Sequence, residues 1–345
     1  MKTLKKKHYV LIVAAVLLLS AAGYVYHFYR QLTAPLLSGT STHYLYIDAD
    51  DSADSVYAKL AGVSTERGLT GLKRLAGHYN YAAQVRSGRY AIEPGQKAVD
   101  VFRMLRGAQQ SPVLLTVPEV RTMERMAARL GAKLMIDSAT IASALTSQDY
   151  CQQLGYDTTT IACLFVPNSY EVYWNTSLDA LMNRLLREHD AFWNEERRQQ
   201  AEAVGLTPNE VVTLASIIDE ETAVNAEKPD IAGMYLNRLE RGMLLQADPT
   251  VKYALKDFSL RRILNRHLEV ESPYNTYRHA GLPPGPIRVP SVQAVEAVLN
   301  PTHHDYLYMC AKEDFSGTHN FARTLAEHNQ NARRYQQALN ERGIR

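Results

Sequence analysis

The chain has 345 residues, which is enough for about two domains beyond a targeting segment. Its 38 basic residues nearly balance 36 acidic ones, and the formal net charge of +2 gives no global field that would favour nucleic acid as a partner. Three cysteines without a CxxC pair exclude a disulfide framework and argue against a structural zinc site; at most one bridge can form, and Cys151 and Cys163 are the nearest pair.

The N-terminus has the pattern of a membrane segment. Several lysines precede an apolar run from Tyr9 to about Tyr26, which is near the lower length limit for crossing a bilayer. Small residues at 20–23 would also suit signal-peptide cleavage, but the run continues through them to an aromatic edge at Phe28. We therefore expect residues 1–30 to be a cytoplasmic N-terminus and an uncleaved single-pass anchor, with the rest of the chain outside the cytoplasm.

A short polar linker and a small module follow the anchor. The linker covers residues 31–42 and the module residues 43–110. Alternation of apolar and polar residues predicts two strands in the module, and amphipathic spacing predicts two helices. In chain order these are a strand at His43–Asp48, a helix at Ser52–Leu60, a strand at Arg86–Ile92 and a helix at Ala98–Arg106. By itself this pattern indicates only a small α+β module.

The next segment has a strand, two helices and a proline-containing loop. We expect the strand at Val113–Val117 and a helix at Met123–Leu130 that begins after the capping residue Thr122. Residues Phe165–Tyr173 are expected to be an irregular loop. A long helix is predicted from Leu178, and its charged stretch near residues 195–198 is interpreted as a solvated end.

A helix with a full set of start signals covers residues 207–222. Thr207 can cap it, Pro208 suits its first position, and Glu210 completes a capping box. Apolar residues at helical spacing follow, which predicts a helix that packs against the core.

Glu221 interrupts the apolar side of this helix. It lies three, four and seven positions after apolar residues, whereas Asp219 points roughly to the opposite side and Glu220 to the flank. Of these consecutive acids, only Glu221 is therefore predicted to face the core. A carboxylate on an apolar face is either paired in a structural ion pair or protonated near neutral pH, and the second state is what a general acid needs.

The C-terminal part continues as a mixed pattern. Pro229–Arg241 is an amphipathic helix, and Asp248 is expected to cap a short helix that begins at the next residue. Tyr306–Ala311 is expected to be a buried strand, and a second capping box at Thr324 opens the last helix.

Two stretches in this part cannot form regular structure. Residues 272–277 and 281–286 are stiff, extended loops of the kind that often edges a polymer-binding cleft. The adjacent His303 and His304 would point to opposite sides of a strand, so no metal site is predicted.

The residues Leu214–Thr222 resemble the A-S-I-[IV]-x-x-E-T signature of the endolytic murein transglycosylases, the YceG-like (MltG) family. Further motifs follow in the same order within residues 206–329: Asn237–Leu239, Asp248–Val251, Ser272–Tyr277, Gly281–Pro284, His319 with Phe321, and Glu327–Asn329. In the N-terminal half the resemblance is only architectural. One loop departs from the family pattern, because Asn168 stands where similar proteins have an aspartate.

The resemblance implies an α+β protein with a transmembrane helix, a LysM-like module at 43–110 and a YceG-like catalytic domain at 111–345. Such an enzyme would sit in the bacterial inner membrane with its catalytic part in the periplasm. Its substrate would be peptidoglycan glycan strands, and peptidoglycan synthases in the same membrane are candidate partners.

The implied reaction cleaves the MurNAc–GlcNAc bond within strands, leaves 1,6-anhydro-MurNAc ends and limits the length of nascent strands. Glu221 would act as acid and base, without a metal or cofactor. Substrate contacts are expected from Gln246, Asp248, Asn275, Tyr277 and His319. Two alternatives stay open: a peptidoglycan-binding scaffold, and a hydrolytic muramidase with Asp219 or Asp248 as second carboxylate.

Overall fold

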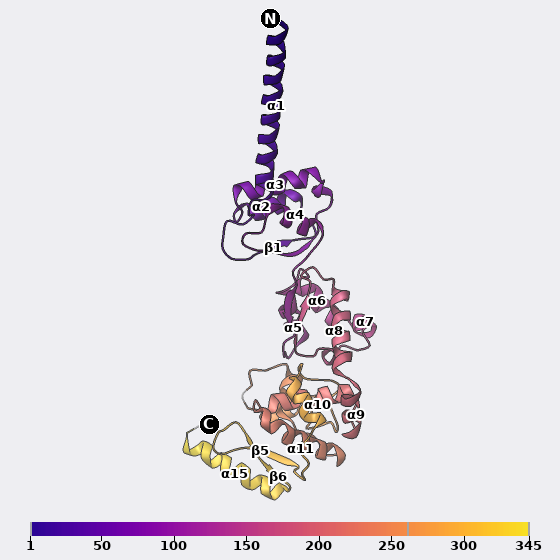
Figure 1. Ribbon diagram of the computed structural model, residues 1–345. Helices are drawn as coiled ribbons and strands as arrows, with labels where there is room; N and C mark the ends of the chain where they lie inside the picture. The colour runs from indigo at the N-terminus through magenta and orange to yellow at the C-terminus, as the bar shows by residue number, and fades with distance from the viewer. Residues whose placement is uncertain (1, 261, 344–345) are drawn as a thin grey trace. The chain divides into compact units, whose positions relative to one another are not determined.

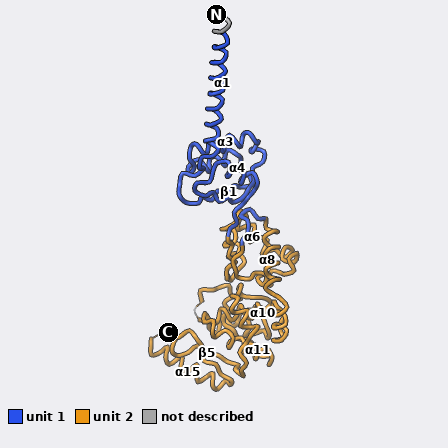
Figure 2. The backbone as a smooth tube through the Cα atoms, viewed as in Figure 1, with its two compact units in different colours: residues 1–113, 171–176 blue, residues 114–170, 177–345 orange. Residues whose placement is uncertain are grey.

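The computed structural model describes residues 2–260 and 262–343, and the chain divides into two compact units (Figures 1 and 2). Unit 1 comprises residues 1–113 and 171–176, and unit 2 comprises residues 114–170 and 177–345. Helices and three two-stranded sheets make up the regular structure of the described residues. The mixed α+β class predicted from the sequence is therefore confirmed.

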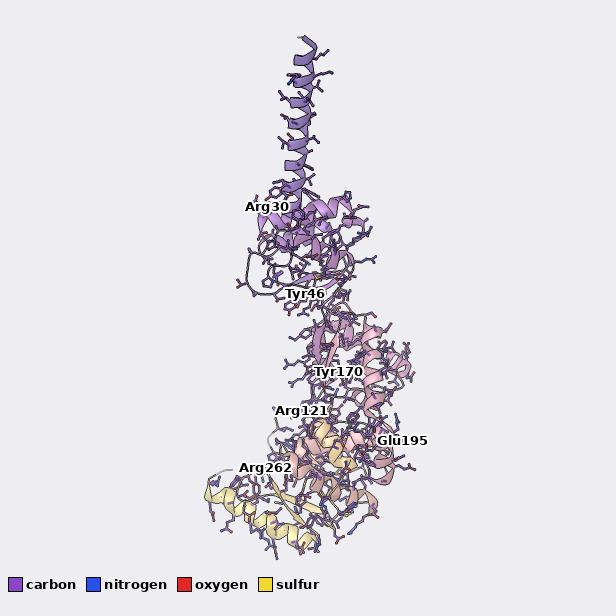
Figure 3. All side chains as sticks on the ribbon, viewed as in Figure 1. Arg30, Tyr46, Arg121, Tyr170, Glu195 and Arg262 are labelled. Atoms are coloured by element: carbon purple, nitrogen blue, oxygen red, sulfur yellow. The ribbon has the colours of Figure 1, made fainter. Side chains whose placement is uncertain are left out.

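Unit 1 begins with a long helix, α1 (Lys2–Leu32). Its segment Lys6–Leu32 is long and apolar enough to cross a membrane, with a mean hydropathy of 2.1 and none of the apolar window buried. Figure 3 shows its side chains projecting on all sides of the helix. The helix is consistent with the predicted single-pass anchor, and a signal sequence would have the same length and composition.

Beyond α1, unit 1 has one sheet and three further helices around a core of its own. In chain order the elements are β1 (His43–Ile47), α2 (Ala53–Ala61), α3 (Glu66–His78), the 3-10 turn η1 (Tyr81–Ala83), β2 (Gly88–Ile92) and α4 (Ala98–Arg106). β1 and β2 are antiparallel, with a register that runs from His43 opposite Ile92 to Ile47 opposite Gly88. The strands and helices expected here are confirmed, with ends shifted by two residues or fewer.

Two features of unit 1 were not expected from the sequence. The helix α3 contains three glycines, which lower helix propensity. One of them, Gly71, is needed because a Cβ there would lie 2.3 Å from the carbonyl oxygen of Gln31. The segment expected to be a linker also packs into the unit, since Gln31 and Leu36 are both buried.

The first part of unit 2 is largely helical. The elements from residue 113 to residue 203 are β3 (Val113–Thr116), α5 (Met123–Gly131), α6 (Ser138–Leu145), α7 (Gln148–Gln153), the 3-10 turn η2 (Ile161–Leu164), β4 (Ser169–Val172), α8 (Leu178–Phe192) and α9 (Glu195–Ala203). The division between the units falls within β3 and within β4, and the helices belong to unit 2. The expectation of an irregular loop at Phe165–Tyr173 is partly wrong, because β4 lies there and pairs with β3. The long helix predicted from Leu178 is two helices, since Asn194 caps a new one after Trp193.

The remaining elements surround α10 (Pro208–Glu221), whose capping box is present as predicted. They are the 3-10 turn η3 (Asn225–Glu227), α11 (Lys228–Glu240), α12 (Asp248–Leu255), α13 (Asn265–Leu268), α14 (Val292–Leu299), β5 (Tyr308–Ala311), β6 (His319–Ala322) and α15 (Leu325–Glu341). Residues 211–218 of α10 are all buried, because α11, α12 and α14 pack around it. The helix is thus enclosed on every side.

β5 and β6 form an antiparallel pair next to α15. The register places Tyr308 opposite Ala322 and Ala311 opposite His319. The strand expected at Tyr306–Ala311 exists, but the prediction that it is buried is wrong, since all four residues of β5 are half-buried. The reason is that one side of this short sheet borders a cavity.

Candidate active site

A cavity of about 420 Å³ in unit 2 lies at the end of α10. Its walls come from α10, α11, the start of α12, the β5–β6 sheet and α15. The lining side chains are Glu221, Met234, Tyr235, Arg238, Leu245, Gln246, Asp248, Tyr277, Tyr308, Met309, Cys310, Ala311, His319, Leu325 and His328. Of the six residues expected from the sequence, the structure brings together all except Asn275.

Glu221 is the last residue of α10, and the extended backbone of Thr222 ends the helix there. Its Oε1 accepts a hydrogen bond of 2.8 Å from the hydroxyl of Tyr235. Burial raises the pKa of the Glu221 carboxyl to about 7, and the negative charge of Asp248 acts in the same direction. The hydrogen bond from Tyr235 and the charge of Lys252 oppose this rise. Near neutral pH the carboxyl can therefore both donate and accept a proton.

Tyr235, on α11, was not expected in the site. Its sequence position suggested only an apolar residue of an amphipathic helix, and its side chain is indeed buried. A buried tyrosine needs a partner for its hydroxyl, which is the only signal the sequence offers. Burial and the neighbouring Glu221 raise the Tyr235 pKa well above its usual value. The hydroxyl therefore stays protonated and holds the Glu221 carboxyl in one orientation.

Asp248 supplies a second carboxylate to the cavity. It is the first residue of α12, and the prediction that it caps this helix is wrong, because Ala247 occupies the cap position without a side-chain cap. Instead, Asp248 Oδ1 accepts a 2.6 Å hydrogen bond from the hydroxyl of Tyr277. The Tyr277 pKa is raised by burial and by this bond. Glu221 and Asp248 thus each accept a hydrogen bond from a different tyrosine hydroxyl.

Arg238 and Gln246 form one wall of the cavity. Arg238 is buried and donates to the carbonyl oxygens of Leu244, Leu245 and Leu307, so it ties the segment before α12 to the start of β5. Its Nη1 also lies 3.4 Å from Oε1 of Gln246. Arg238 belongs to a motif noted in the sequence, but its presence in the cavity was not expected.

His319 opens β6, on the other side of the cavity. Its Nδ1 lies 3.0 Å from Oε2 of the buried Glu227, which also accepts a bond from the His319 backbone. His328 lies nearby with its ring stacked on Tyr308 at 5.5 Å. Burial lowers the pKa of His328, so this imidazole is held in its neutral form.

Asn275 organises a loop and does not line the cavity. Its side-chain nitrogen donates to the carbonyls of Leu268 and Val270, and its Oδ1 accepts from the backbone of Tyr277, at 2.9 to 3.1 Å. It is fully buried. The expected substrate contact from Asn275 is therefore replaced by a role in positioning Tyr277.

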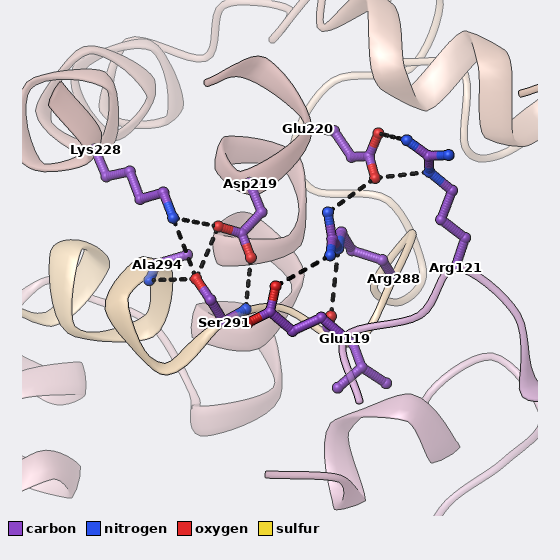
Figure 4. Close-up of polar contacts among 9 residues, drawn as sticks. Glu119, Arg121, Asp219, Glu220, Lys228, Arg288, Ser291 and Ala294 are labelled. Carbon is purple, nitrogen blue, oxygen red and sulfur yellow. Dashed lines mark hydrogen bonds and ion pairs between the residues drawn. The ribbon is translucent and has the colours of Figure 1, made fainter. Parts of the chain in front are cut away.

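The two acids before Glu221 do not line the cavity, and each is held in ion pairs (Figure 4). The Asp219 side chain is 4% exposed, and its carboxylate pairs with Lys228 at 2.7 Å and accepts two bonds from Ser291. The prediction that only Glu221 faces the interior is wrong, because α14 covers the opposite side of α10. Glu220 pairs with Arg121 and Arg288.

Comparison with known proteins agrees with these motifs. The profile of the YceG-like family matches residues 45–334. The chain is 29% identical over 283 residues to an endolytic murein transglycosylase of Bacillus subtilis, covering 76% of this chain and 77% of that protein. A protein of the same name from Streptococcus pneumoniae is 26% identical, and the matched region is 51% of its length.

A solved structure is also similar. The crystal structure of a yceG-like protein from Listeria monocytogenes superposes with a TM-score of 0.55 at 25% identity. The match covers 85% of this chain and 99% of that one.

Proposed function

The chain belongs to the YceG-like family, and on this basis we propose that it is an endolytic murein transglycosylase that cleaves the MurNAc–GlcNAc bond within peptidoglycan strands. The observation that carries the proposal is Glu221, a cavity carboxyl with a pKa of about 7 that is held by Tyr235. The named relatives at 26–29% identity support the same activity.

One carboxyl group is sufficient for this reaction. Protonated Glu221 gives its proton to the glycosidic oxygen, and the bond from that oxygen to the muramic acid C1 breaks. The muramic acid C6 hydroxyl then attacks C1 and returns its proton to Glu221 as the 1,6-anhydro ring closes. The substrate supplies the nucleophile, so no second carboxylate is needed to activate water. The positive charge that develops at C1 is eased by the substrate's N-acetyl group.

The residues around Glu221 support both steps. While Glu221 is ionised, the hydroxyl of Tyr235 donates to it and stabilises the carboxylate. Asp248 opposes that ionisation through its own charge, which favours return of the proton. Gln246, Tyr277 and His319 line the same cavity and are our candidates for holding the sugars.

The Tyr235→Phe variant tests this arrangement. The Tyr235 bond lowers the Glu221 pKa, so its removal should raise that pKa further and move the alkaline limb of the pH–rate profile to higher pH. Turnover should fall roughly ten-fold, because a hydrogen bond to the charged form is lost. An alkaline limb that stays in place or moves to lower pH would show that Tyr235 does not tune Glu221.

A hydrolytic muramidase is the second candidate, because Asp248 puts a second carboxylate in the cavity. It would use water where the transglycosylase uses the C6 hydroxyl.

A peptidoglycan-binding scaffold is the third candidate, and incubation with uncrosslinked strands separates it from both enzymes. We expect fragments of intermediate length from internal cuts; unchanged strands would favour the scaffold, and release of single disaccharides from one end would contradict endolytic action.

We also propose that α1 anchors the protein in the bacterial inner membrane, with the chain after α1 on the periplasmic side. The support is one exposed apolar segment, Lys6–Leu32, preceded by lysines. The full-length protein should fractionate with membranes and resist alkaline extraction. An N-terminal sequence that begins near Ala22 would mean that the segment is a cleaved signal.

Peptidoglycan synthases are our candidate partners, because an enzyme that limits the length of nascent strands needs access to them as they are made. Co-purification from solubilised membranes tests this proposal.

The module in unit 1 is proposed to be LysM-like and to bind glycan without catalysing its cleavage. Its order of strand, two helices and strand, with β1 and β2 antiparallel, supports this. Residues 30–113, which include the core of unit 1, should sediment with insoluble peptidoglycan and leave it uncut. If this fragment is folded and stays in the supernatant, the module has another role.

A further inference from the structure

A second hollow in unit 2, of about 590 Å³, is strongly basic. Its charged lining residues are Glu119, Arg121, Arg125, Arg129 and Arg288, and no residue lines both this hollow and the candidate active site. We call this hollow the arginine pocket. Four guanidinium groups face one lining carboxylate there, so the pocket has a marked excess of positive charge.

Two of the arginines are already engaged with carboxylates (Figure 4). Arg121 donates to both oxygens of Glu220 at 2.8 Å, and Arg288 lies 3.2 Å from Glu220 and 3.3 Å from Glu119. This paired arrangement is the fork geometry with which arginine recognises planar carboxylates. The inner wall of the pocket is therefore fixed, and it is built from carboxylate-binding groups.

Among the residues that the structure describes, the other two arginines have no counter-ion. Arg125 and Arg129 lie four residues apart on α5 and are therefore on the same side of this helix. Both are exposed, and neither makes an ion pair within residues 2–260 and 262–343. Like charges at this spacing repel each other and destabilise a helix. An anionic ligand would remove that repulsion.

We propose that the arginine pocket binds the carboxylates of the peptide stems on the substrate strand, and so helps to hold the strand at Glu221. The proposal rests on peptidoglycan being the substrate. In a polymerised strand the muramic acid carboxyl is amide-linked to the peptide, so the anionic groups of the unit are peptide carboxylates. The volume of 590 Å³ is in the range for an organic ligand and much larger than one inorganic anion needs.

The position of the pocket fits this role. Glu220, which contacts Arg121 and Arg288, is the residue next to Glu221 in α10. Neighbouring residues of a helix are about 3.8 Å apart at Cα and point in different directions. A strand whose sugar lies at Glu221 can therefore place an adjoining stem on the other side of the same helix end.

The binding experiment uses the full-length protein in detergent and a sugar-free stem peptide as the probe. We expect the double variant Arg125→Gln, Arg129→Gln to bind this peptide at least ten-fold more weakly than the wild type. The matched control is Arg187→Gln, Arg241→Gln, which removes the same charge from two exposed arginines outside the pocket. Equal peptide binding by the wild type and the Arg125, Arg129 variant overturns the proposal. Inorganic pyrophosphate serves as a competitor. If it displaces the bound peptide at a concentration ten-fold below that at which unlabelled peptide does so, the proposal is overturned in favour of a phosphate site.

Cleavage provides the functional readout. The wild type should show a lower KM for strands with stems than for strands stripped of their peptides, and the Arg125, Arg129 variant should lose this difference while cleaving stripped strands normally. An unchanged difference in the variant contradicts the proposal. If the wild type cleaves neither strand, the proposed function fails, whereas the peptide-binding result still decides the inference.

Discussion

Replacing Glu221 by glutamine should lower the turnover of glycan strands by about 10²- to 10⁴-fold, because the amide cannot give and retake a proton. The fold should survive, since glutamine keeps the shape of the side chain and can still accept the hydrogen bond from Tyr235. Turnover by the wild type should be lost on the alkaline side of about pH 7, where Glu221 ionises before it can protonate the leaving oxygen. Normal turnover by Glu221→Gln would remove this residue from the mechanism.

The same variant should be more stable than the wild type at neutral and alkaline pH. The pKa of Glu221 is raised from 4.5 to about 7 in the folded protein, so the native state keeps a proton that the unfolded chain has already released. Wild-type stability should therefore fall as pH rises through this window, whereas glutamine has no proton to lose. At pH 8 we expect Glu221→Gln to gain on the order of 1 to 3 kcal/mol in unfolding free energy. Equal stability at pH 4 serves as the control.

Replacing Asp219 by asparagine should destabilise the fold by about 3 to 5 kcal/mol, because it leaves a buried cation without its partner. The side chains of Asp219 and Lys228 are 4% and 5% exposed and lie 2.7 Å apart. After the change, the Lys228 ammonium loses its negatively charged partner, and the neutral Ser291 hydroxyl at 3.2 Å does not balance its charge. Urea unfolding at neutral pH measures this loss.

The variant Asp219→Asn, Lys228→Met is the matched control, since it removes both charges and should recover most of the lost stability. Activity per folded molecule of Asp219→Asn should stay within several-fold of the wild type, because Asp219 does not line the cavity. If Asp219→Asn is as stable as the wild type, the buried ion pair of Asp219 and Lys228 does not stabilise the fold as we expect. A stable but inactive variant would make Asp219 a catalytic carboxylate.

Glu221 could be identified from the sequence because helix capping and helical spacing, which depend only on nearby residues, determine where its side chain points. The capping box at Thr207 places the start of α10, and helical spacing then sets the direction of Glu221 relative to the apolar residues before it. Asp248 and Tyr277 belong to stretches with strong turn and cap signals, and the structure brings both to the same cavity.

The same reasoning failed where distant segments decide the environment. Helical spacing could not show that α14, more than 70 residues later in the chain, encloses Asp219 through Ser291. The hydrogen bond from Tyr235 to Glu221 also depends on how two helices pack, and nothing local predicts it. The helix α3 was missed because its glycines serve close contacts, such as that of Gly71 with Gln31, at the expense of helix propensity.

The most direct test of the central claim is the mass of the new chain ends from defined, uncrosslinked glycan strands. If Glu221 alone carries both proton transfers, the wild type should leave 1,6-anhydro ends, one water lighter than reducing ends. The Asp248→Asn variant should leave the same ends, more slowly and with its alkaline limb at lower pH, because the charge of Asp248 raises the Glu221 pKa. Reducing ends from the wild type, with none from Asp248→Asn, would contradict the account and establish a two-carboxylate hydrolase.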